Sequence, residues 1–182
     1  MFGYLWVMES HHPISTLTFV AIVVLFFSIL PLFILLSFKK LNMVESIEVT
    51  HRENRPLPFL FGIFSYLGGC VLLGYLLQWQ GIIVAALAAL LLGSLITGLI
   101  TLKWKVSIHC TGASIAAMFL FMSPFVMETV WFSLFHVITP VFLASSMIWS
   151  RVRLKAHTLS QATVGTLIGV LTSLLCIYLI SV

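Results

Sequence analysis

Long apolar runs alternate with short polar segments along the whole of this 182-residue chain. A helix needs about 20 apolar residues to cross a bilayer core of roughly 30 Å, and several runs reach that length. An outer-membrane barrel would instead show strands of about 10 residues with alternating polarity, and that pattern is absent. The runs predict six membrane-spanning helices, at residues 15–38, 57–78, 81–102, 107–123, 128–149 and 157–181.

The ends of these runs carry further signals. The fourth run is short, and Ser123-Pro124 predicts its end. Residues 1–14 are too short to span, so we expect them to lie at the membrane interface. They lack the cationic start and the small-residue cleavage site of a signal peptide, so the first run is expected to be an anchor. In the last run, Gly165 and Gly169 predict a face where another helix approaches closely.

Composition places the chain in the membrane. Hydrophobic residues make up 61% of it, charged residues only 8%, and the mean hydropathy is +1.18. A soluble domain carries about 25% charged residues, which this chain would need to cover a water-facing surface. The sequence therefore predicts an all-α polytopic membrane protein, with residues 1–182 forming a single transmembrane domain of about six helices.

The cations are clustered rather than spread. All nine fall in or beside the connections after the first, third and fifth expected spans, so they share one side of the membrane. They are Lys39, Lys40, Arg52, Arg55, Lys103, Lys105, Arg151, Arg153 and Lys155. A soluble nucleic-acid binder would spread its cations over a face or along a helix, so no nucleic-acid partner is expected. If these cations only set topology, their side is cytoplasmic and both termini lie outside.

Three polar segments on that side carry the candidate chemistry. They are EVTHRENRPLP at residues 48–58, KVSIHCTG at residues 105–112 and SRVRLKAHTLSQ at residues 150–161. Arginine guanidinium groups match phosphate oxygens bidentately. Among such groups, one histidine can attack phosphorus and a second can protonate the leaving oxygen. The segments therefore predict a phosphate-ester site.

The third segment has a specific internal spacing. Ser150-Arg151 is followed after five residues by His157, and HTLSQATVG then runs into an apolar helix. This arrangement resembles the third signature motif, S-R-x5-H-x3-D, of the type 2 phosphatidic acid phosphatase family, part of the acid phosphatase and vanadium haloperoxidase superfamily.

The other two segments extend the resemblance. Arg55-Pro56 matches the end of the first motif, K-x6-R-P, and Ser107 and His109 match two positions of the second, P-S-G-H. Their order along the chain and their placement on alternate loops of a six-helix bundle also agree. The resemblance runs from about residue 40 to the end of the chain.

The resemblance implies a role for each matched residue. His157 would attack phosphorus and form a phosphohistidine, and His109 would protonate the leaving group. Arg55 and Arg151 would hold the phosphoryl group, and Ser107 would add a hydrogen bond. Because these cations neutralise the developing charge, neither a metal nor another cofactor is expected. The partner would be an amphiphilic phosphomonoester or diphosphate, such as a phosphatidate, a polyprenyl phosphate or a lipid A phosphate, among the membrane lipids.

Several positions depart from the family's pattern. Glu48 stands at the lysine of the first motif, where a carboxylate repels phosphate, and Val106 and Ile108 replace the proline and glycine of the second. Gln161 replaces the aspartate of the third. Its carbonyl can still accept an N–H from His157 and orient the ring, but it cannot stabilise an imidazolium as a carboxylate does.

These departures leave alternatives open. The chain could be a catalytically degenerate member of the fold that serves as a structural or lipid-binding subunit of a larger membrane complex. The third segment could be a positive anchor between two spans. A haem- or quinone-binding helical subunit is a further hypothesis, because His136 lies inside the fifth expected span and His11 and His12 lie near the N-terminus.

The side of the membrane also stays open at this stage. Resemblance to bacterial proteins implies a multi-pass protein of the bacterial inner membrane, with the site commonly on the periplasmic face. The clustered cations favour the cytoplasmic face instead.

Overall fold

The regular structure of the described residues is entirely helical. The computed structural model describes residues 14–45, 49, 52–79, 81–126 and 131–181. In chain order, its elements are α2 (Thr16–Val24), the π-helix η1 (Leu25–Ile29), α3 (Leu30–Lys40), the 3-10 helix η2 (Arg52–Asn54), α4 (Pro56–Leu76), α5 (Gly81–Thr101), α6 (Ile108–Val126), α7 (Phe135–Arg153) and α8 (Leu159–Ser181). The predicted all-α class is confirmed, while the interfacial segment at residues 1–14 falls almost wholly outside the described residues.

In the part of the chain that the structure describes, five helices are long and apolar enough to cross a membrane, by length and composition. They are Thr16–Lys40, Pro56–Leu76, Gly81–Thr101, Ile108–Phe125 and Leu159–Ile180. This is compatible with a multi-pass membrane protein. The fifth expected span forms α7, which begins at Phe135 rather than 128 and continues through Arg151 to Arg153. With two arginines in its last turn and His136 near its start, α7 is more polar than the other long helices.

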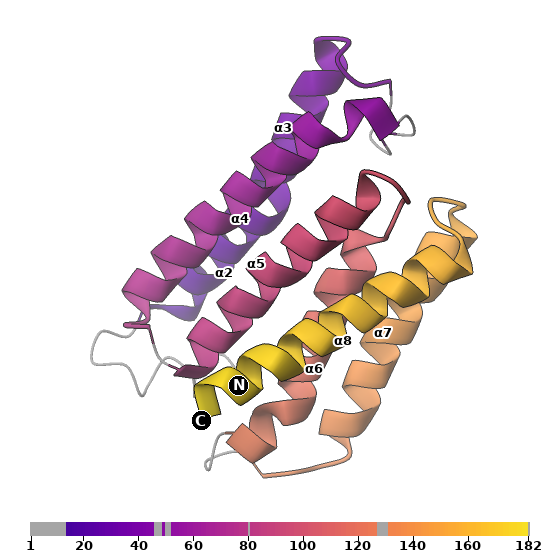
Figure 1. Ribbon diagram of the computed structural model, residues 1–182. Helices are drawn as coiled ribbons and strands as arrows, with labels where there is room; N and C mark the ends of the chain where they lie inside the picture. Colours follow the sequence, from indigo (N-terminus) through magenta and orange to yellow (C-terminus); the bar gives the residue numbers. More distant parts are fainter. Residues whose placement is uncertain (1–13, 46–48, 50–51, 80, 127–130, 182) are drawn as a thin grey trace. The chain divides into compact units, whose positions relative to one another are not determined.

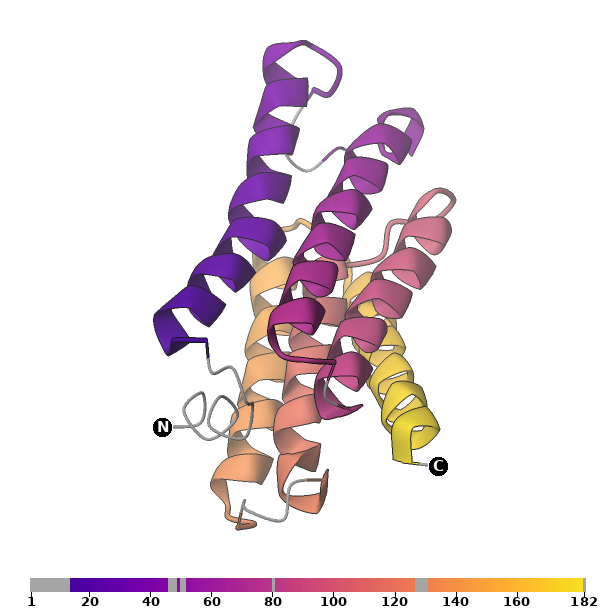
Figure 2. The ribbon, with the colours of Figure 1, turned by 90° about the vertical axis from the view of Figure 1, so that its left-hand side faces the viewer.

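The chain forms two compact units, Met1–Leu87 and Ala88–Val182, and α5 begins in the first and continues into the second. In the first unit, α3 and η1 pack against α4, as Figure 2 shows for the indigo and purple helices. In the second unit, α6 packs against both α7 and α8, and the later part of α5 adds Gly93 beside Thr111 and Thr172. The prediction of a single bundle stays a prediction.

A π-turn interrupts the first span just before Pro31. At the end of this turn the backbone N–H of Leu30 reaches the carbonyl of Leu25, five residues back. In the same register the partner of the Phe26 carbonyl would be residue 31, and proline has no N–H to donate. The hydroxyl of Ser65 donates to the Phe26 carbonyl instead, at 2.6 Å. A backbone group at membrane depth is thereby paired by a neighbouring helix.

The predicted end of the fourth span at Ser123-Pro124 is wrong, because α6 continues through the proline to Val126. Proline removes the hydrogen bond to the carbonyl four residues earlier, which belongs to Leu120. The hydroxyl of Ser123 donates to that carbonyl at 2.8 Å. The serine therefore replaces the bond that the proline removes, and the helix can continue.

Candidate functional site

The second unit carries the candidate site at one of its ends. The α5–α6 and α7–α8 connections both lie at that end, as Figure 1 shows. α6 and α8 consequently both begin there and run away from it in the same direction. The positive ends of two helix dipoles therefore face the same region, which favours an anion.

Ser107 begins α6. It is completely buried, and its Oγ accepts the backbone N–H of Cys110 at 3.3 Å, as an N-cap does. One residue earlier, the N–H of Val106 donates to Oγ1 of Thr101 at 3.2 Å. These two bonds tie the α5–α6 connection to the helices on both sides of it, so the start of α6 has a defined position.

The end of α7 holds the backbone of His157. The carbonyl of Arg151 accepts the N–H of Ala156 at 3.1 Å and that of His157 at 3.3 Å. The bond from Ala156 to Arg151 is the long bond of a Schellman motif at a helix C-terminus. In this motif the residue before the donor, here Lys155, adopts a left-handed conformation. Lys155 takes that conformation, with a φ of 54°. The five-residue gap between Arg151 and His157 is therefore a compact turn that brings the two backbones together.

The start of α8 is a capping box. The N–H of Gln161 donates to Oγ1 of Thr158 at 3.3 Å, and Oε1 of Gln161 accepts the N–H of Thr158 at 3.0 Å. The spacing T-x-x-Q is visible in the sequence and signals this device. The only role expected for Gln161 from the sequence was that of an acceptor for His157, and that orienting role stays a prediction.

The two connections are joined to each other. The backbone N–H of Ser107 donates to the backbone carbonyl of Gln161 at 3.3 Å. One turn further along α8, a Cβ on Gly165 would lie 2.5 Å from the carbonyl oxygen of Ser107. The second and third polar segments thus form one region.

Five of the six predicted site residues share this region: Ser107, His109, Arg151, His157 and Gln161. Arg151 and His157 are half-buried, and His109 is exposed on the first turn of α6. Nε of Arg151 is buried, and no residue in the described part of the chain accepts a hydrogen bond from it. A buried guanidinium N–H of this kind is suited to an anionic ligand.

Arg55 belongs to the first unit. It precedes α4, and its Nε donates to the backbone carbonyl of Val49 at 3.1 Å. Its predicted contact with the phosphoryl group stays a prediction. Glu48, at the lysine position of the first motif, lies outside the described residues.

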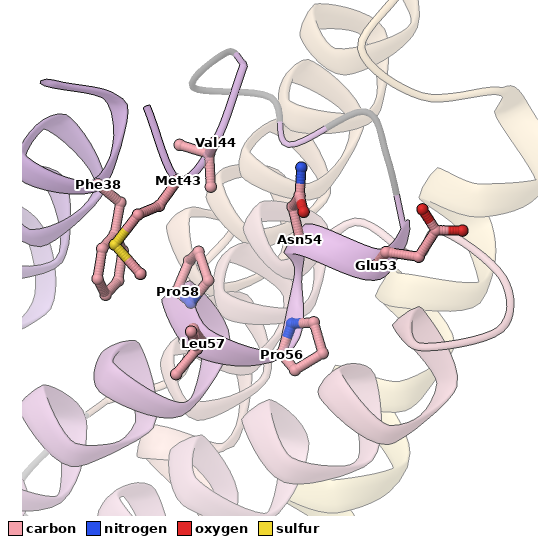
Figure 3. Close-up of a pocket in the computed structure, with 8 residues that line it drawn as sticks. All are labelled: Phe38, Met43, Val44, Glu53, Asn54, Pro56, Leu57 and Pro58. Atoms are coloured by element: carbon pink, nitrogen blue, oxygen red, sulfur yellow. The ribbon is translucent and has the colours of Figure 1, made fainter. Parts of the chain in front are cut away.

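A small pocket lies next to Arg55 in the first unit. It has a volume of about 100 Å³. Its lining comes from the end of α3 and the segment after it, from η2 and from the start of α4, as Figure 3 shows. It consists of Phe38, Met43, Val44, Glu53, Asn54, Pro56, Leu57 and Pro58. Sites for drug-sized ligands occupy roughly 300–1,000 Å³. This pocket is thus too small to hold a lipid head group together with its chain.

His136 lies near the start of α7, away from the arginine end of that helix. It is 2% exposed, and its Nδ1 accepts the backbone N–H of Ser133 at 3.3 Å and lies 3.0 Å from the hydroxyl of the same residue. The rings of Phe132 and Phe135 pack against it. These contacts give His136 a structural role in the turn before α7. His11 and His12 lie outside the described residues.

Within the residues that the structure describes, no three His, Cys, Asp or Glu side chains are grouped so that they could hold a metal ion. The three cysteines, Cys70, Cys110 and Cys176, are buried and free.

Comparisons with known proteins found no matching family model, no matching curated protein and no matching solved structure.

Proposed function

We propose that this chain is a membrane phosphatase that removes phosphate from an amphiphilic phosphomonoester or diphosphate through a phosphohistidine. The observation that carries the proposal is the hydrogen bond from Ser107 N–H to the Gln161 carbonyl. It joins the segments of His109 and His157, while the carbonyl of Arg151 holds the backbone of His157. The proposal thus rests on two histidines and a half-buried arginine that neighbouring segments bring to one end of a membrane bundle.

The proposed chemistry has two steps. In the first, a ring nitrogen of His157 attacks phosphorus, the bond to the ester oxygen breaks, and His109 gives that oxygen a proton. In the second, water attacks the phosphohistidine, the P–N bond breaks, and His109 takes a proton from the water. Inorganic phosphate leaves, and both histidines return to their starting state.

The charges of the region would stabilise the transition state of each step. Arg151 and the N-termini of α6 and α8 would act on the equatorial oxygens, where negative charge develops. Residues 88–182 contain one carboxylate, Glu128, which belongs to the connection between α6 and α7. Repulsion of phosphate by a nearby acid is therefore small in this unit.

Phosphate release from purified protein tests the proposal. We expect release from at least one member of a panel of phosphatidate, polyprenyl diphosphate and lipid A phosphate, and loss of that release in His157→Ala. His136→Asn is the matched control, because it removes a histidine at the other end of α7 and keeps an acceptor near the position of Nδ1. Release that survives unchanged in His157→Ala would refute the role of His157.

A second function is favoured by a specific observation. The Gln161 side chain and the Ser107 hydroxyl each make a hydrogen bond that caps a helix. Residues with such structural roles would be present in a protein that binds a lipid phosphate without hydrolysing it. Saturable binding of a lipid phosphate, with no release by the same preparation, would favour this second function.

A further inference from the structure

The two connections at the candidate end also expose a surface of mixed character. Lys103 and Trp104 project from one connection, and Arg153, Leu154 and Lys155 from the other. We call these five residues the cationic rim. Trp104 is 41% exposed and Leu154 is 66% exposed, although both are large and apolar. Cations therefore alternate with apolar side chains on this surface.

The charge of the rim has little compensation within its own unit. Residues 88–182 contain five cations, all between Lys103 and Lys155, and a single acid, Glu128, which belongs to a different connection. Three of these five cations belong to the rim, and each Lys or Arg near a membrane surface favours contact with anionic lipids. The rim consequently offers charge complementarity to an anion from outside the unit.

Lys155 adds an independent observation. Its left-handed backbone, with a φ of 54°, is one that glycine adopts without cost. A side chain at such a position is strained, because its Cβ lies too close to the following carbonyl oxygen. Strain of this kind persists where the residue has a use. At this position lysine supplies a charge next to Arg153, which glycine would not.

We propose that the cationic rim binds the head groups of anionic phospholipids in the surrounding leaflet. The exposed Trp104 and Leu154 favour a lipid over a soluble anion, because a free phosphate gains nothing from apolar contacts, whereas a bilayer interface accommodates both kinds of side chain. α5 ends and α8 begins next to the rim, and both helices are apolar enough to span the membrane, so the rim lies at head-group depth. This surface is independent of the proposed hydrolysis, since an inactive protein would retain it.

The test measures lipid selectivity on the full chain, reconstituted in phosphatidylcholine. Spin-labelled phosphatidylglycerol and spin-labelled phosphatidylcholine are compared by electron paramagnetic resonance. We expect the protein to prefer phosphatidylglycerol by roughly fivefold, which is the effect of one Lys or Arg near an anionic surface. The preference should fall in 0.5 M salt, since screening weakens exposed charges. Inorganic phosphate at constant ionic strength should not displace the lipid.

The variant Arg153→Gln/Lys155→Gln removes two of the three rim cations and should lose most of the preference. Lys39→Gln/Lys40→Gln is the matched control, because it removes two exposed cations from the end of α3 and leaves the rim intact; it should keep most of the preference. No preference in the unaltered protein would overturn the proposal, even if a variant failed to fold. An equal loss in both variants would also overturn it, because the effect would then follow net charge.

Discussion

The backbone N–H of Ser107 donates a hydrogen bond to the backbone carbonyl of Gln161, over 3.3 Å. Ser107 directly precedes α6 and Gln161 lies in the first turn of α8, so this bond fixes the starts of two helices that run in the same direction. His109 follows the donor by two residues, and His157 precedes the acceptor by four. The relative position of the two histidines therefore depends on how closely α6 and α8 approach.

Gly165 allows α6 and α8 to approach closely, and its replacement by alanine should destabilise the protein. The added Cβ would lie 2.5 Å from the carbonyl oxygen of Ser107, so one helix must shift. We expect a loss of about 1–3 kcal/mol in the free energy of unfolding, as for other overpacked sites. Circular dichroism during denaturation by sodium dodecyl sulfate measures this loss.

Gly112 provides the matched control on α6. A Cβ at this position meets no atom within 4 Å. Because alanine is a better helix former than glycine, Gly112→Ala should be neutral or stabilise by up to about 1 kcal/mol. Equal effects of Gly112→Ala and Gly165→Ala would contradict the close approach of α6 and α8.

The capping box at the start of α8 should contribute measurably to stability. Thr158→Ala and Gln161→Ala each remove one of its two bonds, and each should cost about 1 kcal/mol. Gln161→Glu keeps an acceptor at the same distance and suits a helix N-terminus, so it should cost little. Thermal unfolding in detergent compares the three variants, and an equal cost for Ala and Glu at residue 161 would exclude the capping role.

Lys155→Gly should raise stability in a zwitterionic detergent. Glycine removes the cost of a left-handed backbone, about 1 kcal/mol, which outweighs the loss of an exposed cation. Lys155→Ala is the matched control, since it removes the charge and keeps the strain. If alanine and glycine shift the melting temperature equally, the effect comes from the charge and not from the backbone.

Ser65→Ala should destabilise the first unit. It removes the donor to the Phe26 carbonyl, and inside a membrane no water replaces it. A cost of about 1–2 kcal/mol is expected. Ser146→Ala, which removes only a local bond to the Leu143 carbonyl within α7, should have a smaller effect. Unfolding followed by circular dichroism compares the two, and an equal or larger cost for Ser146→Ala would be the contrary result.

Much of the fold could be predicted because each helix that crosses a membrane needs a run of about 20 apolar residues, and such runs are visible in the sequence. The first span was expected to end at residue 38 and ends at Lys40, and the third was expected at 81–102 and forms Gly81–Thr101. The close approach at Gly165 and Gly169 was also predicted, and the contacts on both confirm it. The predicted end of the fourth span was wrong, because a proline usually stops a helix. Here the hydroxyl of Ser123 donates to the Leu120 carbonyl and replaces the hydrogen bond that Pro124 removes.

The candidate site could be predicted only in part. The spacing of Ser150-Arg151 and His157 marked the third segment, whereas the T-x-x-Q pattern at the start of α8 could have predicted the capping box but was not used. The bond between Ser107 and Gln161 joins residues more than fifty positions apart, so no local pattern could reveal it. The burial of Ser107 likewise follows from the packing of α8 on α6 and not from its own segment.

Direct detection of phosphate on His157 tests the central claim. The protein is mixed with a substrate of the panel labelled with ³²P and quenched in base, where phosphohistidine survives. The proposed mechanism predicts label that is stable to base and labile to acid, located on the peptide that contains His157 and absent from His157→Ala. Hydrolysis that proceeds without label on His157, or with label on another residue, would contradict the mechanism.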